Sequence, residues 1–182
     1  MPVLCTWSPE GGVLGLVAPL ALAAAVGTAL VIDLDPDGPR YPGDRSLARL
    51  AREGPTASDL GPERKGVAVL RNGGVEPIEC VAVIDALCRG WPAVVMRARP
   101  GAERPRRTSV VPVRPLLPGD FLAFSSEPAV YQRYGWHVRP EGPGPVLPPA
   151  RPSTLRALLE GRQPIADRWV RSWRQVWEAA WT

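Results

Sequence analysis

Short apolar runs alternate with segments of helical spacing through the N-terminal half of the chain, and this alternation limits the possible folds most strongly. The runs are Val3–Trp7, Ala29–Asp35, Gly66–Leu70 and Pro92–Met96, and a Pro or Asn follows shortly after each of them. Continuous apolar runs of this length, rich in β-branched residues, are typical of strands that are buried on both faces. We therefore predict that they form the centre of a parallel sheet.

The segments between these runs are predicted to be helices. Leu14–Val26 is rich in alanine and leucine, is apolar on all sides and ends at Gly27, as a buried helix does. Ser46 can cap a helix over Leu47–Glu53, and Glu79–Cys88 has apolar residues at helical spacing. Helices that connect parallel strands make right-handed crossovers and cover both faces of the sheet. The predicted fold class is α/β, a three-layer sandwich with a mostly parallel central sheet.

The C-terminal half is less regular. The elements expected there are a strand over Val110–Val113, a loop over Pro115–Pro118, a short helix within Asp120–Tyr134, an edge strand over Trp136–Arg139, a strand-like Val146-Leu147, a helix over Thr154–Glu160 and an amphipathic helix at about 165–181. A proline-rich connection runs from about 139 to 152. The length of 182 residues suits one domain, which we expect to span 1–182.

Composition argues for a cytoplasmic protein. Cys5, Cys80 and Cys88 lie in apolar stretches without CxxC spacing, as reduced thiols do, and with a single histidine we expect no metal site. Residues 11–32 carry no charge, but Glu10 and not a basic residue precedes them. Because this run also divides into a helix and a strand, we expect neither a membrane span nor a signal peptide.

The net charge of +4 includes one local cluster of basic residues. Its members are Arg97, Arg99, Arg104, Arg106 and Arg107. Such a cluster can meet the phosphates of DNA or lipid, whereas the simpler interpretation is a solvated loop. No aromatic residues interleave with it, so we do not expect a stacking platform for single strands.

The turn between the first strand and the first helix is the favoured anion site of a parallel sheet, because free N–H groups and the helix dipole point there. Here it reads Ser8-Pro9-Glu10-Gly11-Gly12-Val13-Leu14-Gly15-Leu16. On these residues the chain resembles the ParA/MinD family of deviant P-loop ATPases (the SIMIBI class), including its pilus- and septum-associated members. That family carries a lysine, two glycines, any residue, a glycine, a lysine, and then threonine or serine.

The resemblance also shows where this chain departs from the family. The family positions are filled by Glu10 for the first lysine, by the matching Gly11 and Gly12, by Leu14 for the third glycine, by Gly15 for the phosphate-binding lysine and by Leu16 for the magnesium-binding hydroxyl. A P-loop needs a lysine to neutralise the phosphates and a hydroxyl to hold Mg²⁺. Neither is present, and Glu10 adds a negative charge beside the site.

Further segments resemble the family, among them Leu147-Pro148-Pro149 and the stretch through Gly161–Ile165, which resemble its closing strand, helix and turn. Ala29–Gly38 matches the strand whose aspartate lies near the metal and the attacking water, and Trp91–Gly101 matches a segment in which Arg97 replaces an aspartate. Arg97 can pair with Asp33 or Asp35 and so fill the vacated metal region. The resemblance therefore implies a pseudo-ATPase that binds neither ATP nor Mg²⁺.

The last helix carries an apolar stripe with four tryptophans and arginines beside it. The tryptophans are Trp169, Trp173, Trp177 and Trp181. Three interpretations stay open: the helix packs on the sheet, it binds a protein partner or a second copy, or it lies on a membrane surface.

We thus expect a catalytically inactive ParA/MinD-like module that binds or positions a related ATPase, or a pilus, secretion or division assembly. Two alternatives are kept. One is a peripheral membrane- or DNA-associated partitioning or septum-site protein. The other is an enzyme that uses the crevice at Asp33 and Asp35 for another ligand, since carboxylates at a strand end can hold a metal or move protons.

Overall fold

The computed structural model describes residues 2–9, 12–102, 105, 108–118, 127–140 and 142–181. It contains a seven-stranded sheet in the order β3-β2-β4-β1-β5-β6-β7. The strands are β1 (Val3–Trp7), β2 (Thr28–Asp33), β3 (Gly66–Leu70), β4 (Val94–Arg97), β5 (Ser109–Leu116), β6 (Val130–Arg133) and β7 (Val146–Leu147). Every neighbouring pair in this order runs parallel. The predicted α/β class with a parallel sheet is confirmed.

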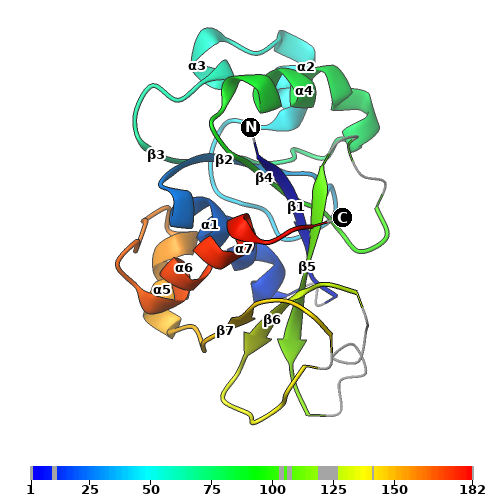
Figure 1. The fold of residues 1–182 in the computed structure, drawn as a ribbon. Helices are drawn as coiled ribbons and strands as arrows, with labels where there is room; N and C mark the ends of the chain where they lie inside the picture. The colour runs from blue at the N-terminus through cyan, green and yellow to red at the C-terminus, as the bar shows by residue number, and fades with distance from the viewer. Residues whose placement is uncertain are drawn as a thin grey trace.

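Helices cover both faces of this sheet (Figure 1). They are α1 (Val13–Val26), α2 (Leu47–Glu53), α3 (Ala57–Leu60), the 3₁₀ helix η1 (Pro77–Cys80), α4 (Val81–Gly90), α5 (Pro152–Leu159), α6 (Arg168–Ser172) and α7 (Arg174–Glu178). In Figure 1, α1 lies with α5, α6 and α7 on one side, and α2, α3 and α4 lie together on the other. The result is the three-layer sandwich that the sequence predicts.

Side-chain alternation along the strands separates two cores. Ala29 and Val31 of β2 join the core under α1, whereas Leu30 and Ile32 join the core under α2 and α4. Helix α1 is apolar on all sides because α5, α6 and α7 cover the face that the sheet does not. Within the uncharged stretch, residues 13–26 thus form a buried helix and residues 28–32 belong to a central strand. In the described ranges, no helix has the length and apolar character needed to cross a membrane.

The C-terminal half departs from several expectations. Val130–Arg133 is strand β6, not part of a helix, because it pairs with β5 and buries the side chains of Val130, Tyr131 and Gln132; residues 120–126 of that predicted helix lie outside the described residues. Trp136–Arg139 forms no strand, and Trp136 is exposed. Strand β5 extends to Leu116, into the predicted loop, since this segment pairs with β6.

The predicted C-terminal helix is two short helices, α6 and α7, which meet at Trp173. The N–H groups of Trp173 and Val176 donate to carbonyls three residues back, at 3.1 Å each, so the chain tightens there. The short helix α3 had no counterpart in the sequence analysis. Its capping box, in which Asp59 accepts from the N–H of Thr56 at 2.8 Å, was the signal for it.

Candidate functional site

The loop between β1 and α1 is the expected anion site. Strand β1 ends at Trp7, and α1 begins at Val13 with Gly12 as its N-cap, which offers no side-chain cap. Glu10 and Gly11 lie outside the described residues. In the sequence analysis, Glu10 brings the negative charge and Gly11 is the first glycine that matches the family. The described geometry of this site therefore starts at Gly12.

The first turn of α1 is built for packing. Leu14 is buried in the core under α1, and Leu16 packs against that core. Gly15 lies between them and carries no side chain. Leu14 and Leu16 thus put apolar side chains at the positions where the family has a glycine and a hydroxyl. Gly15 puts no side chain at the position where the family has a lysine. A lysine head group or a hydroxyl oxygen that would bind phosphate or Mg²⁺ is missing from these positions.

The charged centre of the site lies on β2 and β4. Asp33 and Arg97 are register partners on these adjacent strands, on the face that α1 covers. Arg97 Nη1 donates to Asp33 Oδ1 at 3.1 Å and Oδ2 at 3.2 Å, and its Nη2 donates to Asp35 Oδ2 at 2.9 Å. Arg97 and Asp33 are only 5% and 1% exposed. The predicted pairing of Arg97 with these aspartates is confirmed, and both aspartates take part.

The carboxylates in this cluster have no oxygen left over. Asp33 Oδ1 also accepts from the N–H of Asp35 at 3.2 Å, and Asp35 Oδ1 accepts from the N–H groups of Asp37 at 3.2 Å and Gly38 at 3.0 Å. Arg97 Nη1 further donates to the carbonyl of Pro39 at 2.8 Å. With Arg97 in place, the four carboxylate oxygens of Asp33 and Asp35 are all engaged within the chain.

Tyr41 and Gly38 complete the cluster, and sequence reasoning missed both. The Tyr41 ring lies 5.8 Å from Arg97 Cζ, and its hydroxyl donates to the carbonyl of Leu16 at 2.8 Å. A side chain at Gly38 would overlap the Asp35 carboxylate and the Arg97 guanidinium. The turn signal Pro36-Asp37-Gly38 was visible in the sequence, but nothing in it indicated this close approach.

Burial sets the protonation of the cluster. It raises the pKa of Asp33 to about 6, while the nearby Arg97 guanidinium acts in the opposite direction. Burial likewise raises the pKa of Tyr41. Asp33 is therefore ionised at neutral pH and gains a proton in mild acid, whereas Tyr41 stays neutral.

The described part of the basic cluster is not a free patch. Arg97 is buried, and Arg99 pairs with Asp37 at 2.9 Å and with Glu76 at 3.8 Å. Arg104, Arg106 and Arg107 lie outside the described residues.

The four tryptophans of the C-terminal segment divide into two pairs. Trp169 and Trp173 are buried and meet edge to face, with ring centroids 5.6 Å apart. Trp177 and Trp181 are partly exposed; Trp177 Nε1 donates to the carbonyl of Leu22 on α1 at 2.9 Å, and Trp181 Nε1 to Val176 at 2.7 Å. Trp169 and Trp173 thus fit the interpretation in which the segment packs on the fold, and only Trp177 and Trp181 present surface.

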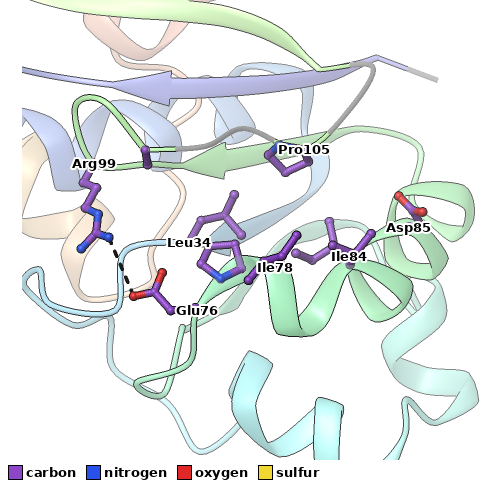
Figure 2. A pocket seen from close by; sticks show the side chains of 10 residues that line it. Leu34, Glu76, Ile78, Ile84, Asp85, Arg99 and Pro105 are labelled. Atoms are coloured by element: carbon purple, nitrogen blue, oxygen red, sulfur yellow. Dashed lines mark ion pairs between the residues drawn. The ribbon is translucent and has the colours of Figure 1, made fainter.

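A large cavity opens on the other face of the sheet, beyond Leu34 at the end of β2 (Figure 2). Its volume is about 670 Å³, within the range of ligand pockets. The sticks in Figure 2 show Arg99 and Glu76 paired at one end and Ile78, Ile84 and other apolar side chains along one wall. The sequence analysis did not foresee it.

The all-parallel sheet, the strand order and the opening strand, loop and helix together define a doubly wound α/β protein. The structure is similar to the crystal structure of a ParA family ATPase from Chlorobium tepidum TLS, with a TM-score of 0.68 and 12% sequence identity over 98% of each chain. At this identity the similarity shows the fold, which is that of a ParA-like P-loop NTPase. No protein-family model matches the sequence, and no curated protein matches it.

Proposed function

We propose that this chain is a pseudo-ATPase: a ParA-like domain that binds and positions a protein partner and does not hydrolyse ATP. Such a partner would be a related ATPase or a pilus, secretion or division assembly. The observation that carries the proposal is the Arg97 guanidinium bonded to Asp33 and Asp35. We infer that this guanidinium, a cation that belongs to the chain, takes the region where the family resemblance would put Mg²⁺.

The first turn of α1 supports the same proposal. Mg²⁺–ATP brings several negative charges, and P-loops neutralise them with a lysine and a hydroxyl-bound metal. Gly15 and Leu16 provide neither group, and each carboxylate oxygen of Asp33 and Asp35 already accepts from Arg97 or from a backbone N–H. The proposal therefore does not depend on any single residue. It rests on three separate features: the missing lysine, the missing hydroxyl and the aspartates that are already bonded within the chain.

Calorimetry with ATP and Mg²⁺, combined with a phosphate-release assay, tests the inactive state. We expect no binding in the micromolar range and no release above the blank. Micromolar binding together with phosphate release would end the proposal. A triple variant, Gly15→Lys/Leu16→Thr/Arg97→Asp, restores the family residues at these positions. If it keeps the wild-type circular dichroism spectrum, it is expected to gain nucleotide binding.

We propose the surface beside the large cavity as the one that contacts the partner. Ile78 and Val81 are large apolar residues that are 68% and 45% exposed, and both line the cavity. Exposed apolar side chains next to a cavity are typical of surfaces that bind other proteins. Ile165 is exposed to a similar degree, 56%, but does not line this cavity, so it provides a matched control.

Crosslinking the tagged chain in its own cells, followed by quantitative mass spectrometry, tests this surface. We expect Ile78→Asp to remove a specific crosslinked protein that Ile165→Asp retains. Equal crosslinking in the wild type and in both variants would place the partner elsewhere and reject the cavity as the binding surface.

A further inference from the structure

A small polar crevice lies where β2 and β3 end, on the side of α2. It has a volume of about 170 Å³, and three of its lining side chains are arginines: Arg40, Arg52 and Arg71. The remaining lining includes Asp33, Asp35, Pro36, Ser46, Ala48, Asn72 and Gly73. Arg40 and Arg52 are exposed and Arg71 is partly buried, so water screens part of their mutual repulsion, and an anion between them would remove the rest.

These three arginines lack an acidic partner of their own. Within the described ranges, Arg40, Arg52 and Arg71 form no ion pair with a carboxylate. The two aspartates in the lining are bonded to Arg97 instead. The crevice and its immediate surroundings are therefore net positive.

Arg71 is held in place by its backbone. Its carbonyl accepts from the N–H of Leu47 at 2.8 Å, and the next carbonyl, that of Asn72, accepts from Ala48 at 3.0 Å. The Asn72 side chain fixes the following turn by accepting from the N–H groups of Gly74 and Val75 at 2.8 Å each. The end of β3 is thus rigidly joined to the start of α2.

The side chain of Arg71 nevertheless has an unmet requirement. Its Nε is buried and has no hydrogen-bond partner among the described residues. A buried donor of a charged group that lacks an acceptor within the chain is unfavourable, and in native proteins water, an ion or a ligand supplies that acceptor. An oxyanion accepts from several guanidinium donors at once, which makes it the group that matches this crevice best.

We infer that this crevice binds the phosphate group of a small phosphorylated ligand through Arg40, Arg52 and Arg71. Its volume is well below the roughly 300 Å³ at which pockets enclose whole ligands, so only the phosphate enters and the rest of the ligand stays outside. The site is separate from the loop before α1. Strand β4 lies between β1 and β2, which puts the end of β2 roughly 10 Å from the end of β1 and β3 farther still.

Calorimetric titration of the intact chain with inorganic phosphate and with AMP, at low ionic strength, tests this inference. Arg71→Gln and Arg52→Gln remove one guanidinium each, and Arg156→Gln is the control, since Arg156 is an exposed arginine on α5 that does not line the crevice. Circular dichroism establishes that each variant is folded; should Arg71→Gln not fold, Arg52→Gln, on the exposed side of α2, takes its place.

We expect saturable binding that Arg71→Gln weakens by about tenfold or more, as loss of a charge-assisted bond does, and that Arg156→Gln leaves unchanged. Tighter binding of AMP than of phosphate would assign the site to phosphomonoesters, and equal binding would assign it to the free anion. Absence of saturable binding by either probe overturns the inference. So does binding that is the same in wild type, Arg71→Gln and Arg52→Gln, which would place the anion in the loop before α1 or on the general surface.

Discussion

Replacement of Arg97 by methionine tests how the charged centre is held together. Methionine keeps an unbranched apolar side chain at this position but removes the buried positive charge. Asp33 and Asp35 are then left without the cation that lies between them. Arg97 donates four hydrogen bonds, three of them to carboxylate oxygens. Removal of one partner from a buried ion pair costs about 3–5 kcal/mol. We expect Arg97→Met to lower the free energy of unfolding by about that amount at pH 7.5.

The size of this loss should depend on pH. Burial raises the pKa of Asp33 to about 6 in the folded protein, from an ordinary value of 3.8. A carboxyl group whose pKa is raised by folding contributes stability that is present below the unfolded value and is lost as pH rises through about 6. Without Arg97 this pKa rises further, because the cation that lowered it is gone. The deficit of Arg97→Met should therefore be smaller at pH 5 than at pH 7.5.

Urea unfolding followed by tryptophan fluorescence measures the loss of stability at pH 7.5 and at pH 5. A double variant then tests whether this loss comes from the unpaired charge of Asp33. Asp33→Asn removes the charge that Arg97→Met leaves unpaired, so the double variant should lose less stability than the sum of the two single variants. Arg156→Met, at an exposed position, controls for the loss of any arginine and should change stability by about 0.5 kcal/mol or less. A loss below about 1 kcal/mol for Arg97→Met at pH 7.5, or an equal loss at both pH values, would refute the reasoning.

Three other predictions follow from the described geometry. Gly38→Ala places a methyl group into the ion-pair cluster and should cost about 1–3 kcal/mol in urea unfolding, whereas Gly12→Ala, which has open space around its Cβ, should cost far less; equal costs would contradict the packing at Gly38. Burial raises the pKa of Cys88 to about 11, so its reaction with iodoacetamide in the native protein should be slow at pH 8 and still rising at pH 10; a plateau near pH 9 would show an ordinary thiol. If Trp177 and Trp181 contact a membrane, changing both to serine should reduce flotation with anionic liposomes, and unchanged flotation would remove that alternative.

The sequence indicates the fold because several segments along it share one requirement, burial of an apolar strand on both of its faces. Ala29–Asp35 and its counterparts are continuous apolar runs, and only a sheet covered on both faces buries such runs. Where this repetition stops, prediction fails. Val130–Arg133 is short and half polar, with Gln132 and Arg133 following Val130 and Tyr131, so its place beside β5 depended on long-range pairing that local pattern does not encode.

The candidate site shows the same division. The pairing of Arg97 with Asp33 or Asp35 could be predicted because the family resemblance puts all three residues around the same vacated metal region. Tyr41 and Arg71 could not, because their positions depend on how irregular segments turn back toward the sheet. Arg71 reads as an ordinary arginine after a strand, and only its backbone bonds to Leu47 and its buried Nε distinguish it.

The bond from Tyr41 to the carbonyl of Leu16 joins the segment after β2 to the start of α1. In a nucleotide-driven switch, segments that contact the γ-phosphate and its metal ion are ordered by those contacts and released on hydrolysis. Here the positive charge beside Tyr41 is covalently part of the chain and cannot leave. On the proposed function, the domain would present one permanent conformation to its partner, and any timing in the assembly would have to come from the partner's own cycle.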